Sequence, residues 1–107
     1  MAFADNLKTL PSITHLAALE LLDARGDVVA IIENKPGKAG SLTVYAALAA
    51  RYGQINDAAA REGLDLFAEH TADARANPGK HPNIDRLIAL IGTQTALSVR
   101  TVAANRA

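Results

Sequence analysis

A short polar stretch between an apolar run and an amphipathic segment holds residue types that suit the binding of an anion. It reads Glu-Asn-Lys-Pro-Gly-Lys-Ala-Gly-Ser and spans residues 33–41. Lysine is positively charged, glycine lets a ligand approach the backbone, and the first N–H groups of a helix carry a partial positive charge. We therefore predict a binding site for a small anion, formed by Asn34, Lys35, Gly37, Lys38, Gly40 and Ser41.

The same stretch also has a purely structural interpretation. Pro36 and Gly37 favour a turn between a strand and a helix, and Ser41 suits the N-cap of that helix. The spacing matches neither a P-loop nor a dinucleotide fingerprint. The pattern thus predicts a place to bind rather than a reaction, and the structural interpretation stays open.

A second group of polar residues falls near the end of the next helical segment and in the loop after it. Glu69, His70, Asp73 and His81 are residue types that ligate divalent metals or transfer protons. They lack the second histidine four positions on that marks a zinc-protease helix. The structural alternative is that His70 packs on the apolar face of its helix and His81 orders the loop. We keep these four residues as an alternative site, which requires helix and loop to fold back together.

The hydrophobic pattern predicts the elements that position these residues. Apolar runs within residues 13–22 and over 28–33 flank a short Asp/Gly loop and indicate a β-hairpin, while alternation over 96–102 indicates a third strand. Helices are predicted over residues 3–9, 41–52, about 57–75 and 84–91, the last capped by Asn83. We expect one α+β domain over residues 1–107. It has a three-stranded, mainly antiparallel sheet, made of the N-terminal hairpin and the C-terminal strand, with about three helices on one face.

Three single residues carry further structural predictions. Gly53 suits the C′ position that ends the helix over residues 41–52. Gly63 falls in the middle of the next apolar helix face, which predicts the close approach of another element. His15 falls in the first strand, as a surface or edge residue without an assigned role.

Composition narrows the classes of function. Eleven basic residues balance eleven acidic ones, which argues against a general nucleic-acid binder. The chain has no cysteine, so disulfides and thiolate metal sites are excluded. No apolar run approaches the roughly 20 residues that span a bilayer, and the first residues do not form a signal peptide. We expect a cytoplasmic, non-enzymatic module that binds a small anion or a protein partner, without a cofactor, a nucleic-acid partner or a membrane partner. The alternative is a small metal-dependent or acid/base enzyme that uses the region of His70 and His81.

Charge and sheet edges bear on self-association. A three-stranded sheet has two edges that a protein must cover or charge, and a net charge of zero weakens repulsion between copies. A homodimer is therefore an expected partner. A monomer whose N-terminal segment covers one edge is the alternative.

The chain resembles known protein families in two ways. Residues 32–42, with their Asn-x-Pro-Gly motif, resemble the start of an ACT regulatory domain, in which the Pro-Gly turn and the helix start help to bind amino acids. The likeness ends where residues 55–76 predict a helix instead of a strand pair. Over nearly the whole chain, the sequence is similar to a small family of uncharacterised bacterial proteins, on residues 32–41, 60–71 and 77–85. That resemblance implies a bacterial origin and no mechanism.

Overall fold

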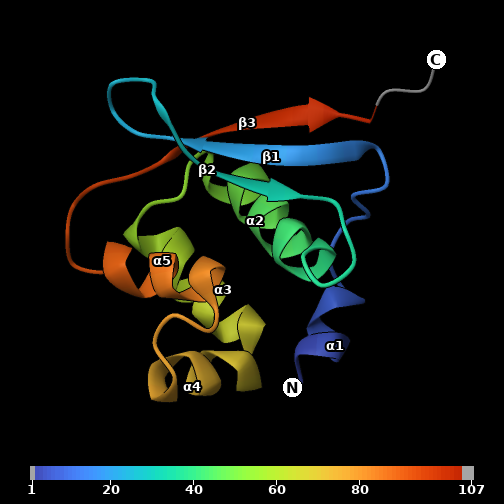
Figure 1. The fold of residues 1–107 in the computed structure, drawn as a ribbon, viewed down its shortest axis with the longest axis vertical. Helices are drawn as coiled ribbons and strands as arrows, with labels where there is room; N and C mark the ends of the chain where they lie inside the picture. Colours follow the sequence, from blue (N-terminus) through green and yellow to red (C-terminus); the bar gives the residue numbers. More distant parts are fainter. Residues whose placement is uncertain (1, 105–107) are drawn as a thin grey trace.

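The computed structural model describes residues 2–104 and has a three-stranded sheet with helices on one side (Figure 1). The elements follow the order α1 (Phe3–Leu7), β1 (Leu16–Leu22), β2 (Val28–Glu33), α2 (Ala39–Tyr52), α3 (Asp57–Phe67), α4 (Glu69–Ala76), α5 (Pro82–Leu90) and β3 (Ser98–Ala103). The α+β class and the predicted sheet are confirmed. The described residues form five helices rather than about three. None of these helices is long and apolar enough to cross a membrane.

The sheet has the order β2-β1-β3, and both strand pairs are antiparallel. The central strand β1 pairs Leu19 with Ile32 of β2 and with Thr101 of β3. Leu19, Leu21 and Ile32 are buried beneath the helices, because alternate side chains of a strand point to one face. The opposite face of the sheet is not covered by a helix in Figure 1.

The core forms where α2 lies between the sheet and α3 (Figure 1). α3 packs against both α2 and α5, and Gly63 lies at that contact. A Cβ atom on Gly63 would stand 2.7 Å from Leu87 Cδ1 and 2.9 Å from Leu48 Cδ1. The predicted close approach is therefore confirmed. Gly53 also ends α2 in the left-handed conformation, as predicted.

Several predicted boundaries are wrong. His15 lies in a turn before β1 rather than in the strand. Ser41 is not an N-cap, since a preceding turn has already started α2 and Lys38 takes the N-cap position. Asn83 is not a cap either, because Pro82 begins α5 and His81 precedes it. Proline suits this first helical position because its missing N–H would have had no partner there.

The long helix predicted over residues 57–75 is interrupted at Ala68, which adopts φ 51° and ψ −119° and separates α3 from α4. An L-residue with a side chain rarely adopts such a conformation, so the sequence gives no local sign of the break. The Thr71 hydroxyl donates a hydrogen bond to the Leu64 carbonyl across it. The break gives α4 its own direction and brings it beside α5.

Candidate ligand-binding cavity

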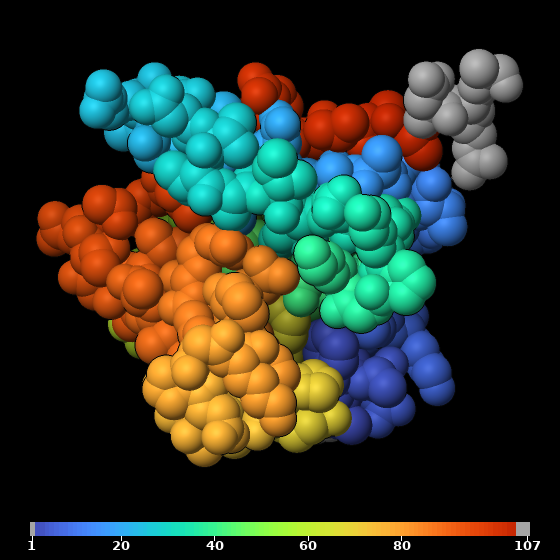
Figure 2. Space-filling view, viewed as in Figure 1, coloured from blue at the N-terminus to red at the C-terminus, as the bar shows by residue number. Residues whose placement is uncertain are grey.

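A cavity of about 620 Å³ lies where α1, the start of α2, α4 and the start of α5 meet. Figure 2 shows the hollow between the orange segment near residue 80, the teal segment near residue 40 and the blue N-terminal segment. Its lining includes residues from both predicted sites. Gly37, Lys38, Gly40 and Ser41 come from the first site, and His70 and His81 come from the second. Two sites that the sequence keeps apart therefore share one cavity.

The other predicted site residues do not line the cavity. The Asn34 amide donates to the carbonyls of Ile13 and Leu16, at 3.3 and 2.8 Å, and fixes the loop to the start of β1. The Lys35 ammonium pairs with the Glu33 carboxylate at 3.2 Å on the surface.

Two acidic residues of the second predicted site also stand outside the lining. The Glu69 carboxylate accepts a hydrogen bond from the Phe3 N–H at 2.8 Å, which ties α1 to α4. Asp73 holds two cavity residues by their side chains. Both carboxylates thus position the lining instead of forming it.

Two turns of similar sequence bring lysines into the cavity. Pro36-Gly37-Lys38 precedes α2, and Pro78-Gly79-Lys80 precedes α5. In each turn glycine has a positive φ, 84° at Gly37 and 94° at Gly79, and the lysine N–H donates to the residue three positions back. Proline second and glycine third is the pattern of a type II turn. The two segments thus share a Pro-Gly-Lys motif, but the motif gives no sign that they lie together in the fold.

The charged side chains of the lining are all basic, namely Lys38, Lys80 and Arg86. No aspartate or glutamate stands among the described residues that line the cavity. Within residues 2–104, neither Lys38 nor Arg86 forms an ion pair with a carboxylate. The cavity therefore carries positive charge that the described part of the chain does not neutralise.

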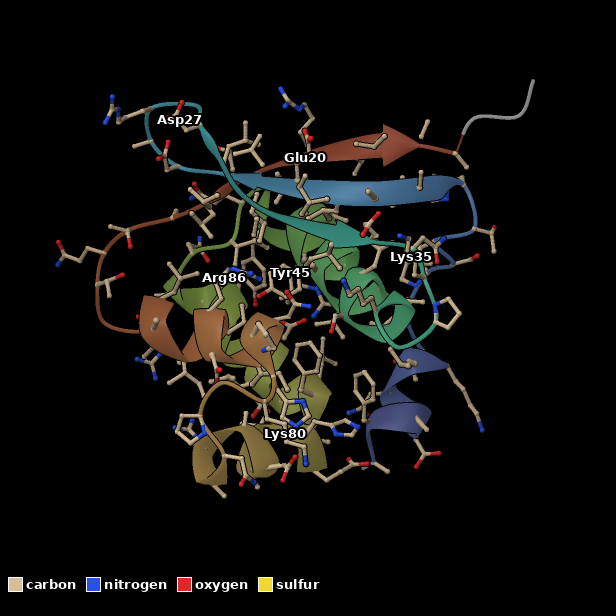
Figure 3. The ribbon with its side chains drawn as sticks, viewed as in Figure 1. Glu20, Asp27, Lys35, Tyr45, Lys80 and Arg86 are labelled. Atoms are coloured by element: carbon tan, nitrogen blue, oxygen red, sulfur yellow. The ribbon has the colours of Figure 1, made fainter. Side chains whose placement is uncertain are left out.

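Arg86 is held in place by two neighbours, and it was not among the site residues predicted from the sequence. Its Nη1 donates to Asn83 Oδ1 at 2.8 Å and to the Tyr45 hydroxyl at 3.2 Å, and its guanidinium lies 5.8 Å from the Tyr45 ring centre (Figure 3). Burial raises the pKa of Tyr45 to about 12, against the opposing effect of Arg86. The phenol stays protonated at neutral pH and donates to the Asn83 carbonyl. The sequence signal for Arg86 is that it is the single basic residue of α5.

Asp73 connects the second turn to α4. Its Oδ2 lies 2.6 Å from His81 Nε2 and 3.0 Å from Lys80 Nζ. The hydrogen bonds from His81 and then Lys80 lower the pKa of Asp73 to about 2. An ionised carboxylate can only accept, so the proton of this bond belongs to His81 Nε2.

The fold brings His70 and His81 together, as the alternative site required. Their ring centres lie 5.7 Å apart, and His70 is half-buried in the cavity wall rather than packed in the core. Across the described residues, no group of three or more histidine, aspartate or glutamate side chains has the arrangement of a metal site. The arrangement thus fits hydrogen bonding and proton transfer, and the metal-binding prediction gains no support from it.

Part of the cavity wall is apolar. Phe3 stacks on Phe67 with ring centres 5.4 Å apart, and the Phe3 ring also lies against the first turn of α2. A Cβ atom on Gly40 would stand 3.0 Å from Phe3 Cζ. Glycine at this position therefore makes room for an aromatic ring, a role that was not predicted from the sequence.

The first turns of α2 and α5 both reach the cavity. Among the described residues, the backbone N–H groups of Gly40, Ser41 and Asn83 donate no hydrogen bond. All three residues belong to the cavity lining. Unpaired N–H groups at helix starts favour a negatively charged partner, so they add to the effect of the basic side chains.

Fold and cavity together define a small α+β domain with one basic, partly apolar cavity of a size typical for small-molecule ligands. The chain belongs to the family DUF2322, described as an uncharacterised protein conserved in bacteria, whose sequence model matches residues 3–101. This confirms the resemblance to an uncharacterised bacterial family. Neither the comparison with curated proteins nor that with solved structures found a match.

Proposed function

We propose that this domain is a non-enzymatic module that binds a small organic anion in the cavity. The observation that carries the proposal is the charge of the lining, which has three basic side chains and no carboxylate among the described residues. Buried or half-buried charge is normally paired within a protein. Arg86 is half-buried and forms no ion pair within residues 2–104, and the exposed Lys38 at the same cavity forms none either. The cavity is therefore suited to an anion from outside.

The proposed contacts fall into two sets. Lys38 and the N–H groups of Gly40 and Ser41 form the first, at the start of α2. Arg86 forms the second, and its hydrogen bonds to Tyr45 and Asn83 reduce the conformational entropy that it would lose on binding. A guanidinium with free N–H groups suits the two oxygens of a carboxylate or phosphate.

Binding to the full chain can be measured by NMR titration with carboxylates and phosphates. We expect Lys38→Ala to weaken the affinity about tenfold, or about 1.4 kcal/mol, which is the size of one hydrogen bond to a charged group. Lys35→Ala is the matched control, because it removes the same charge three residues away, outside the cavity lining. Equal losses in the two variants, or no binding to the unaltered chain, would contradict the proposal.

A second candidate function is proton transfer by His81. It is favoured by the 2.6 Å contact with Asp73, which orients the imidazole and leaves Nδ1 for exchange with a bound molecule. Following each bound anion by NMR over a day tests this candidate. An anion that is converted by the unaltered chain but not by His81→Asn would support it. Anions that remain unchanged would count against it.

A further inference from the structure

We propose that the anion bound in this cavity carries a planar aromatic ring. This inference rests on the proposed function and names its ligand class. The chain is poor in aromatic residues, with two phenylalanines, two tyrosines and no tryptophan. Both phenylalanines and two of the three histidines nevertheless line the cavity. The chain thus concentrates four of its few rings at the proposed ligand cavity.

The four rings form a continuous band along the cavity wall. Phe67 stacks on Phe3 with ring planes 15° apart, and Phe3 meets the edge of His70 with centres 4.9 Å apart. His70 leads on to His81 at 5.7 Å. Phe67 is buried, but the other three rings are half-buried and keep part of their surface open. Stacked and edge-to-face contacts favour another ring over an aliphatic group of equal area.

This band of four rings, which we call the ring wall, adjoins the proposed anion-binding end of the cavity. Phe3 lies against Gly40, which belongs to the first turn of α2 and offers one of the unpaired N–H groups. A ligand that uses both features has its ring joined to its anionic group directly or through a short linker. Aromatic carboxylates and mononucleotides share this chemistry, and the cavity of about 620 Å³ lies within the range of sites for such molecules.

Two matched pairs of probes test the inference on the full chain. Phenylacetate is compared with cyclohexylacetate, and adenosine monophosphate with ribose 5-phosphate, by NMR titration at one salt concentration. We expect the ring-bearing member to bind about fivefold more tightly or better in at least one pair. A preference in the first pair alone identifies an aromatic carboxylate, and one in the second pair alone a nucleotide.

The failures of the two proposals are distinguishable. Anions that bind with equal affinity within each pair, to about a factor of two, would overturn the ring inference and leave anion binding in place. No binding by any of the four probes would overturn the proposed function and the inference with it.

Variants locate the preference on the ring wall. Phe3→Leu should lower the affinity for the ring-bearing probe to that of its counterpart without an aromatic ring. The affinity for that counterpart should not change. His70→Leu, on α4, gives an independent reading if Phe3→Leu fails to fold. Tyr52→Leu is the control, because Tyr52 bonds to Glu62 outside the cavity lining. A preference that survives both Phe3→Leu and His70→Leu, or that is lost in Tyr52→Leu, would contradict the assignment.

Discussion

The two Pro-Gly-Lys turns have nearly the same backbone and differ in the surroundings of their lysines. Lys38, in the first turn, forms no ion pair with any carboxylate of residues 2–104. Lys80, in the second, lies 3.0 Å from Asp73, which also holds His81. The first turn thus presents a charge without a carboxylate partner in the described part of the chain, while the second belongs to a network that ties the loop before α5 to α4.

The comparison shows that the local sequence determines the conformation of each turn, whereas residues from other elements determine the surroundings of its lysine. Proline and glycine fix the turn and aim the lysine in both cases. Whether the lysine is neutralised depends on a carboxylate from another element. Asp73 is provided by α4, whose direction follows from the break at Ala68. A similar turn therefore fixes the loop to α4 in one place, and we propose that it binds the ligand in the other.

The largest effect is expected when the turns themselves are broken. Gly37→Val and Gly79→Val should each destabilise the fold by about 2 kcal/mol, because a β-branched residue is strained at positive φ. No heavy atom stands within 4 Å of an added Cβ at either glycine, so the cost is conformational and should be alike in both turns. Urea unfolding followed by circular dichroism measures it.

A marked inequality between the two variants would contradict the equivalence of the turns. The second turn has one additional hydrogen bond, which the Gly79 N–H donates to the Asp85 carboxylate at 2.9 Å. Asp85→Ala measures that contribution separately. If Gly79→Val remains much more costly after that correction, the backbone of the two turns is less similar than their hydrogen bonds indicate.

The next effect separates the two lysines. Lys38→Ala should weaken anion binding about tenfold, whereas Lys80→Ala should weaken it only about two- to threefold. The reason is that Asp73 already engages the charge of Lys80, so less of it acts on a ligand. NMR titration of the two variants with the same anion checks this order. A larger loss of affinity in Lys80→Ala than in Lys38→Ala would indicate that the anion contacts the second turn instead of the first.

Much of the fold could be predicted from the sequence, because the signals were local. A Leu/Ala run and a Val/Ile run around an Asp/Gly loop indicated the hairpin, and alternation indicated the last strand. Gly53 and Gly63 were assigned correctly, since each has a simple steric reason. The helix starts were less predictable, because Ser41 and Asn83 look like caps only when the preceding turns are ignored.

The cavity could not be predicted from local sequence patterns, because it forms between segments that are far apart in the chain. Its lining joins residues from positions 3 to 86, and no periodic pattern shows that α1 closes over α2 and α4. Arg86 gains its position through Tyr45, a contact between α2 and α5 that only the tertiary structure provides. The role of Gly40 likewise depends on Phe3, whose ring packs against it from a distant part of the sequence. The sequence suggested individual residues for an anion site, which stays a prediction, but it did not indicate the cavity that groups some of them.

A smaller change should make the second turn resemble the first. Asp73→Asn keeps the shape of the side chain and removes its charge, which leaves Lys80 without an ion pair. We expect anion affinity to rise about threefold, because a basic side chain of the lining gains charge available to the ligand. The gain should disappear in the double variant Asp73→Asn with Lys80→Ala. An unchanged or lower affinity in Asp73→Asn alone would show that Lys80 does not reach the ligand.

The smallest effect is a dependence of stability on pH that only the second turn should show. The pKa of Asp73 is about 2 in the folded chain, below the ordinary value of about 3.9 for an unfolded aspartate. Folding therefore favours the ionised form, so the contribution of Asp73 is complete above about pH 4 and is lost as pH falls towards about 2. The stability difference between the unaltered chain and Asp73→Asn should shrink over that range in urea unfolding.

The first turn provides the control for this measurement, because Lys38 has no carboxylate partner among the described residues. The stability difference between the unaltered chain and Lys38→Ala should stay constant over the same range of pH. If that difference also shrank, general charge repulsion at low pH would explain both results, and the Asp73 network would lose its special role. If only the Asp73→Asn difference shrinks, the two turns differ in chemistry even though they share a backbone.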